Sequence, residues 1–578
     1  MKYNKISKAL LEKFKKIVGE QNCISEYAIR WTYAFGPTIF EKNWVPDLVI
    51  IAQSTDQVSK ILRLANKEKI AVTPRGSGTS LSAGHLTSHG GVMLDLSQMD
   101  DILSVDIVNN MVEVEPGVIC DDLNEDLKPY GYFFPPDPGS SSICTIGGMV
   151  ATNAGGVQAF KYGVTKDYVL TLEVILPNGE ILRLGAKVLK SVSSYNMKDL
   201  IVGSEGTLGV ITKVGLRIRP LPKFRKLGFF VYDQLEKVSE AVIELRKRGI
   251  VPNMLEFIDD VVIRVVYDYL GDEYKNYPVG YVLIAEVDGR DTSQVDHDFS
   301  LLFEIFKNKE PRFYKVAETD EERDILIKAR KASLPATSRI KSFTCTEDCS
   351  IPITEFSATV KKIKKIPKKI GSSNLSVGIT CHMEGNLHPK FLFNENNPKD
   401  VKDFQKAMDY LYNVIILPIG GSLTGEHGIG KVKTPYLASE HPETVVNLMK
   451  DLKLLFDPNE ILSPGQGKGL LTELPRTPTK RTLENQPNKI LTFNCMRCGL
   501  CAPSCVSKKV YRLEAFSPRG RLSILNGLIF GDLLSVNSAI INKILHTCTL
   551  CGECKTQCPA GVITFEIFEK AREILHHS

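Results

Sequence analysis

Two clusters of cysteines near the C-terminal end constrain this chain more than any other feature. The chain has 578 residues and 14 cysteines, and eight of the cysteines lie within residues 495–558. The other six are scattered over the preceding sequence, unlike the dense disulfide framework of a small secreted domain. Metal ligation is therefore the better interpretation of the eight clustered cysteines.

Both clusters have the spacing C-x-x-C-x-x-C-x-x-x-C. They are Cys495, Cys498, Cys501 and Cys505, followed by Cys548, Cys551, Cys554 and Cys558. In two-cluster ferredoxins, the first three cysteines of such a run bind one 4Fe–4S cluster and the fourth binds the other. That logic assigns one cluster to Cys495, Cys498, Cys501 and Cys558, and the other to Cys548, Cys551, Cys554 and Cys505. Zinc is the alternative, but a tetrahedral zinc site does not need three equally spaced cysteines plus a fourth.

The overall composition is that of an ordinary globular protein of three or four domains. The formal net charge is only +5, with acids and bases mixed, so nothing indicates binding to nucleic acid. Residues Met1–Glu20 are polar and predict an amphipathic helix without the apolar core of a secretory signal. Because no stretch approaches the ~20 apolar residues of a membrane span, we expect a cytoplasmic protein, at most peripheral to the inner face of the membrane through a partner.

Changes in composition divide the chain. We expect an N-terminal helical segment over residues 1–40 and two larger domains over 41–221 and 222–468. A linker rich in Pro, Thr and Lys follows at 469–488, and the cysteine-bearing domain spans 489–578. Hydrophobic periodicity predicts a strand, a helix and a strand at Leu48–Ala52, Asp56–Lys67 and Ile70–Thr73, and a hairpin at Val169–Leu176 and Glu180–Leu184.

Three glycine-rich loops stand out before residue 221. They are Pro74–Ser80, the passage Pro135–Gly163, and Gly203–Gly209. The first follows a predicted strand, so its backbone N–H groups are suited to a diphosphate. It is not a dinucleotide fingerprint, because Leu81 stands where the third glycine is required. A single loop of this kind is more often just a turn.

Together and in this order, the three loops resemble the vanillyl-alcohol-oxidase or p-cresol-methylhydroxylase (PCMH) type of FAD-binding domain. Over about residues 40–468 the resemblance is closest to the branch of glycolate oxidase flavin subunits and D-lactate dehydrogenases. It implies an α+β fold: the FAD-binding domain, then an FAD-linked oxidase C-terminal α+β domain. A small α-helical, ferredoxin-like two-cluster domain, similar to that of heterodisulfide reductases, follows.

The resemblance also implies FAD bound without a covalent link. The residues that it assigns to the cofactor are Pro74, Arg75, Gly76, Ser77, Gly78, Thr79, Ser80, Gly139, Ser140, Thr145, Gly148, Asn153, Ala154, Gly206, Val210 and Ile211. His85 and His89 lie near the first loop and are interpreted as surface or packing residues.

Two further segments, Cys381–His388 and Gly425–Gly430, resemble the substrate motifs of this branch. The resemblance implies a divalent metal (Zn, Mn or Fe) on His388 and Glu426, with His427 as the base and Arg330 for the substrate carboxylate. The family's first metal-binding histidine aligns with Cys381, one residue before His382. The third ligand is therefore Cys381 or, by a local shift, His382, unless the metal is absent. Glu384 replaces the motif aspartate.

These features predict an FAD-dependent D-2-hydroxyacid dehydrogenase, of the D-lactate or glycolate type, that forms the 2-oxo acid. Electrons would leave through the two clusters to a separate subunit: a heterodisulfide-reductase-like or glycolate-oxidase-type iron–sulfur protein, or an electron-transfer flavoprotein. One alternative is an electron-transfer subunit without its own turnover of 2-hydroxy acids. Another is a non-redox synthase of the same superfamily, which would have no need of the cysteine clusters.

Overall fold

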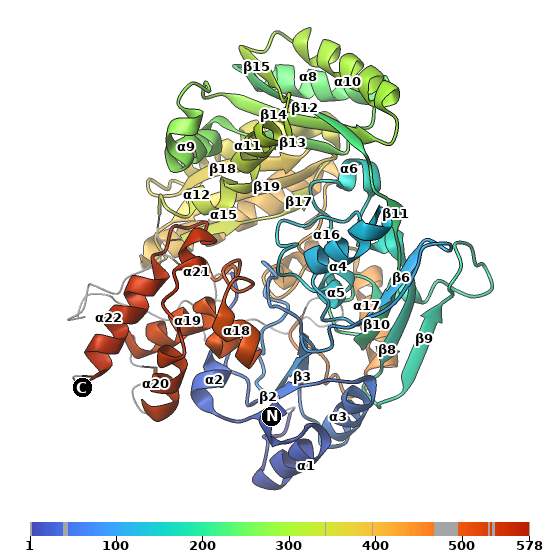
Figure 1. The fold of residues 1–578 in the computed structure, drawn as a ribbon, viewed down its shortest axis with the longest axis vertical. Helices are drawn as coiled ribbons and strands as arrows, with labels where there is room; N and C mark the ends of the chain where they lie inside the picture. Colours follow the sequence, from blue (N-terminus) through green and yellow to red (C-terminus); the bar gives the residue numbers. More distant parts are fainter. Residues whose placement is uncertain are drawn as a thin grey trace.

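The structure is a computed structural model that describes residues 3–37, 44–341, 343–395, 397–466, 495–529, 532–533 and 538–576. The linker predicted at 469–488 lies outside these residues. The described helices and strands form three regions that meet near the centre of the molecule (Figure 1). We call them the FAD-binding region, the cap and the iron–sulfur region.

Besides a two-stranded pair of β7 (Tyr132–Phe133) and β11 (Arg219–Pro220), the FAD-binding region contains two small sheets. In the first, with strand order β1-β2-β4-β3, the last three strands are parallel. The second is antiparallel, with order β5-β6-β10-β8-β9. The strands are β1 (Cys23–Ile24), β2 (Leu48–Ile51), β3 (Val72–Arg75), β4 (Val92–Asp95), β5 (Ile102–Asp106), β6 (Met111–Val114), β8 (Val169–Ile175), β9 (Ile181–Gly185) and β10 (Val210–Arg217).

Helices α1 (Lys8–Val18) and α3 (Thr55–Lys67) share one apolar core with the parallel strands, and α5 (Ile146–Thr152) contacts β10. The predicted order of strand, helix and strand at residues 48–73 and the predicted hairpin at 169–184 are confirmed by β2, α3, β3, β8 and β9. The N-terminal segment is not helical throughout, because it also contributes β1 to the first sheet.

The cap is built on one antiparallel sheet of order β15-β12-β14-β13-β18-β19-β16, with β17 paired to β19. Its strands are β12 (Phe224–Tyr232), β13 (Met254–Ile258), β14 (Tyr281–Gly289), β15 (Phe313–Val316), β16 (Phe343–Thr346), β17 (Cys349–Ser350), β18 (Ser376–His382) and β19 (Asn386–Phe393). Its main helices are α8 (Leu235–Lys247), α9 (Asp260–Leu270), α10 (Thr292–Lys307), α11 (Asp320–Lys331), α12 (Ser333–Thr337), α13 (Phe356–Lys364) and α15 (Pro398–Tyr410).

The two faces of the central cap strands differ in chemistry. Side chains alternate along a strand, so Cys381 and Leu387 enter the apolar core under α8, α10, α13 and α15. The next residues, His382 and His388, face the other way. The sheet therefore presents a polar row toward the centre of the molecule.

The iron–sulfur region is a set of helices that packs on the N-terminal part of the chain (Figure 1). The helices are α18 (Val506–Tyr511), α19 (Pro518–Ile529), α20 (Ser538–His546), α21 (Glu553–Thr556) and α22 (Thr564–His576). Trp31 is the last residue of α2 (Tyr27–Trp31) and is buried against α19. Its Nε1 donates a hydrogen bond to the carbonyl of Ser523 at 2.9 Å. The two ends of the chain thus share one hydrophobic core.

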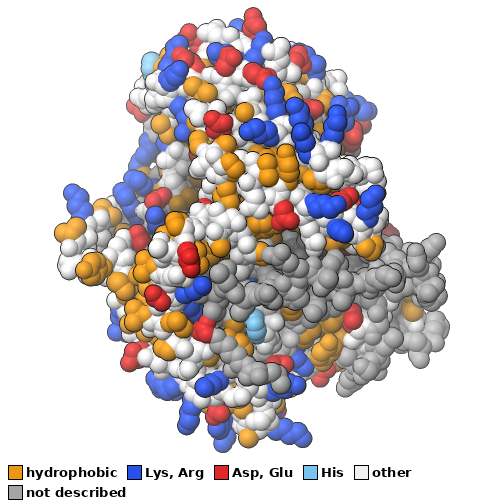
Figure 2. Space-filling view, turned by 180° about the vertical axis from the view of Figure 1, so that it is seen from behind, with side chains coloured by type: hydrophobic (Ala, Val, Ile, Leu, Met, Phe, Trp, Pro, Cys, Tyr) orange, Lys and Arg blue, Asp and Glu red, His pale blue; other side chains and the backbone are white. Residues whose placement is uncertain are grey.

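The surface carries charges of both signs. Acidic and basic side chains intermingle over the face shown in Figure 2, where basic ones are prominent on the cap at the top. Within the described ranges, no helix combines the length and apolar character needed to cross a bilayer.

Candidate active site and electron-transfer centres

A cavity of about 730 Å³, here called the central cavity, lies where the three regions meet. Ligand sites typically have volumes of ~300–1,000 Å³. The FAD-binding loops line one wall. Cap residues of β18, β19 and α11 line a second, and Cys498, Leu500 and the segment 556–559 of the iron–sulfur region line a third.

The structure brings most of the predicted FAD-binding residues to this cavity. Those that line it are Pro74, Arg75, Gly76, Ser77, Gly78, Thr79, Ser80, Gly139, Ser140, Thr145, Gly148, Ala154, Gly206 and Ile211. Asn153 and Val210 are not among them. Asn153 ends α5 in the left-handed conformation and accepts from the Lys166 N–H, and Val210 is buried in the core beneath the first sheet. His85 is buried and also lines the cavity, so it is not a surface residue.

The loops are suited to a cofactor that is bound mainly by backbone N–H groups. A Cβ on Gly76 would lie 2.1 Å from Thr145 Oγ1, so the first two loops approach each other at a distance that only glycine permits. Gly78 has a φ of +64°, which also favours glycine. The lining N–H and hydroxyl groups of Ser77, Thr79 and Ser80 suit the diphosphate of FAD.

Two histidines and a glutamate form a close group in the cap wall. Glu426 Oε1 lies 3.3 Å from His382 Nε2 and 3.2 Å from His388 Nε2. All three side chains offer ligand atoms within 4.8 Å of one another. Two imidazoles and one carboxylate are a donor set for Zn²⁺, Mn²⁺ or Fe²⁺ with a position left for substrate. The residues present therefore fit a divalent metal.

The structure does not bring Cys381 into this group. Its side chain is on the opposite face of β18, buried in the apolar core, and its thiol donates to the His382 carbonyl. His382 pairs with Asn386 across the hairpin and points toward Glu426. The strand alternation thus corrects the alignment that placed Cys381 at the metal and favours the local shift to His382.

Burial and neighbouring charges set the protonation of the group. Burial lowers the pKa of His388 to about 4 despite its hydrogen bond to Glu426, which leaves the imidazole in the neutral form that binds metals. Burial would raise the pKa of Glu426, but His382 and His388 hold it well below its usual range.

Glu256 is a functional candidate that sequence reasoning missed. It is buried on β13, 2.5 Å from His382 Nδ1, and also pairs with Arg330. A carboxylate behind a histidine is the usual outer partner in metal sites, because it fixes the ring orientation. In the sequence, the indication of a role for Glu256 was that it is a charged residue within the otherwise apolar stretch Met254–Ile258.

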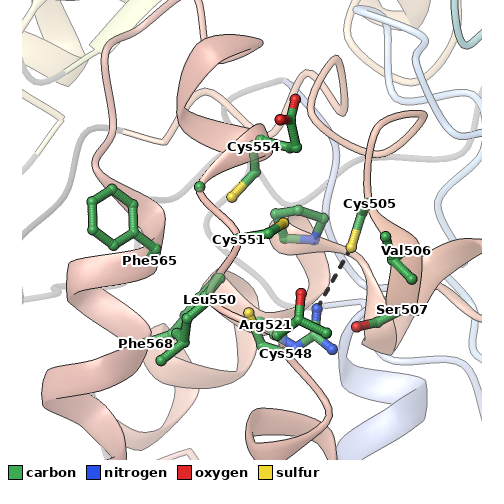
Figure 3. A pocket seen from close by; sticks show the side chains of 14 residues that line it. Cys505, Val506, Ser507, Arg521, Cys548, Leu550, Cys551, Cys554, Phe565 and Phe568 are labelled. Atoms are coloured by element: carbon green, nitrogen blue, oxygen red, sulfur yellow. Dashed lines mark hydrogen bonds between the residues drawn. The ribbon is translucent and has the colours of Figure 1, made fainter.

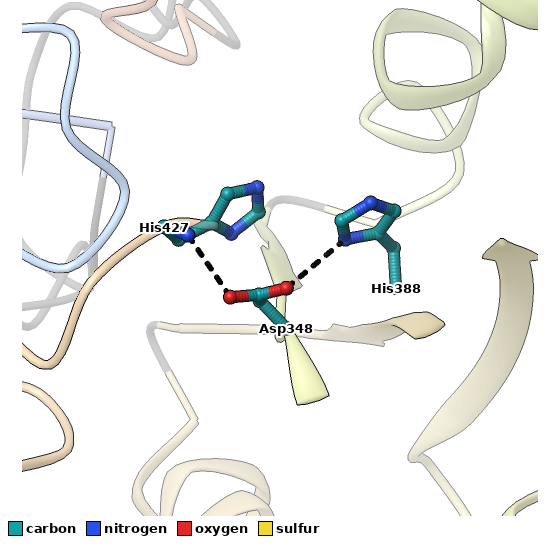
Figure 4. A group of neighbouring side chains, drawn as sticks. All are labelled: Asp348, His388 and His427. Carbon is teal, nitrogen blue, oxygen red and sulfur yellow. Dashed lines mark hydrogen bonds and ion pairs between the residues drawn. The ribbon is translucent and has the colours of Figure 1, made fainter. Parts of the chain in front are cut away.

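Asp348 is the second missed residue. It groups with His388 and His427 (Figure 4), and its Oδ1 lies 3.8 Å from His388 Nδ1. Its Oδ2 accepts from the backbone N–H of Gly425, Glu426 and His427 at 2.9–3.1 Å. Burial would raise the pKa of Asp348, but His427, Lys433 and His388 hold it below its usual range. We interpret Asp348 as the residue that fixes the turn carrying Glu426 and His427.

Two cationic side chains line the cap wall beside the metal group. Arg330 on α11 is paired with Glu256, and its Nη1 lies 3.4 Å from Ser333 Oγ. Lys390 on β19 is only 2% exposed and donates to Thr380 Oγ1 at 2.7 Å. Burial, with Arg330 nearby, lowers the pKa of Lys390 to about 7. Sequence reasoning missed Lys390, although it continues the alternation Asn386, His388 on the same strand face.

The clustered cysteines fall into two groups of four. In the first group, burial raises the pKa of Cys501 well above its usual value, and the nearby Cys495, Cys498 and Cys558 raise it further. The second group is Cys505, Cys548, Cys551 and Cys554, which surround a small cavity of their own (Figure 3). This grouping has the crossed pattern in which the fourth cysteine of each run joins the other set.

The spacing of the sulfurs does not fit single zinc ions. Within the described residues, which include all eight of these cysteines, no three of their sulfur atoms lie within 4.8 Å of one another. A tetrahedral Zn–S₄ site with ~2.3 Å bonds would hold its sulfurs about 3.8 Å apart. Four cysteines in each set match the number of thiolates that hold a 4Fe–4S cubane.

A buried ionic network joins the first cysteine group to the FAD-binding region. Arg519 on α19 pairs with Glu514 at 2.7 Å and donates to the carbonyl of Ser77, in the first glycine-rich loop, at 3.0 Å. Glu514 also lies 3.7 Å from Arg75 in that loop. The cysteine group and the predicted diphosphate loop are therefore held in a fixed relation.

Three models of known protein families match three successive segments of the chain. The model of the FAD-binding domain matches residues 46–185, that of the C-terminal domain of FAD-linked oxidases matches 221–466, and that of the 4Fe–4S dicluster domain matches 492–562. The solved structure of p-cresol methylhydroxylase with bound substrate superposes with a TM-score of 0.66 at 18% identity, over 80% of this chain and 97% of that one. An alkyldihydroxyacetonephosphate synthase gives a TM-score of 0.62 at 18% identity, over 80% and 86% of the two chains. These likenesses support the predicted fold class.

The fold and the matched domains define an FAD-linked oxidoreductase with a 4Fe–4S dicluster domain. The glycolate oxidase subunit GlcD of Bacillus subtilis is 35% identical over 461 residues, covering 80% of this chain and 97% of the relative. The D-lactate dehydrogenase of Anaerostipes hadrus is 33% identical over 473 residues, covering 80% and 98%. The chain belongs to the family of FAD-linked oxidases that includes these two proteins, as the sequence motifs predicted.

Proposed function

We propose that this protein is an FAD-dependent D-2-hydroxyacid dehydrogenase that sends its electrons through two 4Fe–4S clusters to a separate protein. One observation carries the proposal. The same cavity is lined by the His382–His388–Glu426 group, by His427, by the glycine-rich loops, and by Cys498 and Cys558. Substrate chemistry and electron exit would therefore share one cavity. The expected cytoplasmic location stays a prediction.

The chain's residues have distinct proposed roles in the oxidation. FAD, when bound, accepts a hydride from the hydroxyl-bearing carbon, and a metal on His382, His388 and Glu426 would polarise the hydroxyl. His427 takes the hydroxyl proton, because its Nε2 lies 3.7 Å from Glu426 Oε1, beside the metal group. Arg330 orients the carboxylate end of the substrate. The substrate loses two electrons and two protons in all, and becomes the 2-oxo acid.

The proposed route of the electrons follows from which cysteines line the cavity. Cys498 and Cys558 of the first group line it, whereas none of the second group does among the described lining residues. Cys551 of the second group is exposed. Electrons would pass from the cavity to the first cluster, then to the second, and leave to a partner near Cys551.

The His427→Ala variant tests the chemical step. Loss of a general base typically slows a reaction by ~100- to 10,000-fold, so we expect flavin reduction to slow by that factor while FAD stays bound. Anaerobic stopped-flow absorbance with a panel of D-2-hydroxy acids measures this. The matched control is His297→Ala, an exposed histidine on α10.

Two outcomes would contradict the proposal. A His427→Ala enzyme that reduces its flavin at the normal rate would remove His427 from the chemistry. A wild-type holoenzyme whose flavin no 2-hydroxy acid reduces would instead favour an electron-transfer subunit without its own turnover.

A further inference from the structure

Lys390 is a buried amine that lines the central cavity and, among the described residues, has no carboxylate within ion-pair distance. Its side chain is almost wholly buried, and its ammonium donates to one neutral partner, Thr380 Oγ1. In the described part of the chain, no carboxylate lies within 4.0 Å of it. Burying an unpaired charge is costly, so such a group in a ligand cavity points to an anion that completes it.

The neighbouring carboxylates are committed to other groups. Glu256 is shared between His382 and Arg330. Asp259 caps α9 by accepting from the Val262 N–H and lies 3.5 Å from Lys364. Both act on Lys390 only at longer range, because each has a nearer cationic partner: Arg330 for Glu256 and Lys364 for Asp259.

Arg330, unlike Lys390, already has a carboxylate partner. Its guanidinium is already paired with Glu256, and it lies next to His382, at the metal group. It is therefore suited to hold the carboxylate adjacent to the reacting carbon. Lys390 is one alternation beyond His388 on β19, about 7 Å further along the strand. The two cations serve different places along a bound substrate.

The surroundings of Lys390 form a small polar pocket. Across the sheet its neighbours are Gly378 on β18 and Thr346 on β16. Thr346 Oγ1 is shielded from solvent and has no hydrogen-bond partner in the described residues, and Thr346 and Thr380 both line the cavity. A Cβ at Gly378 would lie 2.5 Å from Val262 Cγ2, so α9 packs closely there and closes that side of the pocket. One ammonium and two hydroxyls are a donor set for a carboxylate.

We propose that Lys390, Thr346 and Thr380 form a subsite for a second anionic group, and that the substrate is a 2-hydroxy dicarboxylate. This inference rests on the proposed 2-hydroxyacid dehydrogenase activity and narrows it. The carboxylate next to the hydroxyl is held near Arg330 and the metal group, and the distal carboxylate is held by Lys390. The oxidation itself is unchanged.

Pairs of acids of equal chain length test the subsite in the intact holoenzyme. The pairs are D-2-hydroxysuccinate with D-2-hydroxybutyrate, and D-2-hydroxyglutarate with D-2-hydroxyvalerate. A charge-assisted hydrogen bond is equivalent to ~10- to 150-fold in affinity. We expect the dicarboxylate of at least one pair to give a second-order rate of flavin reduction higher by that factor, measured by anaerobic stopped flow.

The Lys390→Met variant then assigns the preference to its residue. It should lose the ~10- to 150-fold advantage of the dicarboxylate while the monocarboxylate of the same length changes little. Thr346→Val is a milder second variant, expected to reduce the preference in part, and Lys365→Met, on the exposed side of the cap, is the control. Retained FAD absorbance shows that each variant is folded. Perturbation of the flavin spectrum by glutarate, compared with valerate, gives a readout of binding that needs no turnover.

The possible failures are distinguishable. Equal rates for both members of each pair overturn the subsite but leave the 2-hydroxyacid dehydrogenase standing. A Lys390→Met variant that loses activity equally on both members shows that Lys390 binds the common carboxylate, which overturns the dicarboxylate class. If no acid of either kind reduces the flavin, the proposed function fails and the subsite with it.

Discussion

The two cysteine groups have the same sequence spacing but lie in different surroundings. The first meets the central cavity through Cys498 and Cys558, and the second has Cys551 exposed. Each has a buried arginine of α19 beside it. Arg519, near Cys498 and Cys501, is paired with Glu514, whereas Arg521 lies 3.9 Å from the Cys505 sulfur and donates to the carbonyls of Phe516 and Ile544.

This difference has a physical consequence for electron flow. A positive charge near a cluster favours its reduced form, and the effect weakens when a carboxylate neutralises that charge. Among the described residues, Arg521 makes no ion pair within 4.0 Å, while Arg519 does. In the proposed electron route, the first cluster would receive electrons from the cavity and the second would hold them at an exposed exit.

The largest effect is expected from Cys551→Ser. Flavin reduction by substrate should stay close to normal, because the residues proposed for that step all lie before residue 467. Delivery to a protein acceptor too large to enter the cavity, such as cytochrome c, should fall at least ~100-fold, as expected when a ligand of the exit cluster is lost. Stopped flow would show normal flavin bleaching followed by a stalled reduced enzyme.

A small dye that can enter the cavity serves as the control acceptor for Cys551→Ser and should still be reduced. Normal delivery to cytochrome c by the variant would mean that the second cluster is not the exit, and the contrast between the two groups would be lost.

A smaller effect is expected from Glu514→Gln, which breaks the network at the first group. Removing one partner of a buried ion pair typically costs ~3–5 kcal/mol, so the iron–sulfur region should lose its clusters at a lower temperature. The loss of cluster absorbance on anaerobic heating measures this. Glu569→Gln, at an exposed position on α22, is the control and should leave the transition unchanged.

The pH dependence of the Glu514 effect has a definite sign. Burial would raise the pKa of Glu514, but Arg519 and then Arg75 and Lys508 hold it well below its usual range. A depressed folded-state pKa contributes stability that is fully present above the unfolded value of about 4.3 and is lost as the pH falls below it. The difference between wild type and Glu514→Gln should therefore be constant from pH 8 to 5. A difference that shrinks already at pH 7 would contradict this assignment.

The smallest effect is expected from Arg521→Gln. Loss of the unpaired charge should lower the reduction potential of the second cluster by up to roughly 100 mV, with little change at the first. A redox titration followed by electron paramagnetic resonance separates the two clusters. Arg512→Gln, a half-exposed arginine paired with Asp100, is the control. Equal shifts of both clusters would refute the local role of Arg521.

The sequence by itself determined the parts that depend on residue type and short spacing. The cysteine runs, the glycine-rich loops and the Glu426–His427 pair are contiguous, and their chemistry follows from ligand identity and backbone freedom. They were sufficient for the family, the cofactors and the fold class. Most of the positions predicted for FAD line the cavity, whereas Asn153 and Val210 are not among its lining residues.

Only the tertiary structure decided which side chains face one another. Cys381 and His382 are adjacent in the sequence, and the phase of β18 sends one into the apolar core and the other to Glu426. Glu256 on β13 and Asp348 in the loop between β16 and β17 lie more than 30 residues before the histidine motif, and the pairing of the cap strands brings them behind His382 and His388. Lys390 became a candidate because its burial and its lack of a counter-ion depend on β16 and β18. Such properties are set by neighbours distant in the sequence, because a strand's own pattern fixes only its alternation and not what lies opposite.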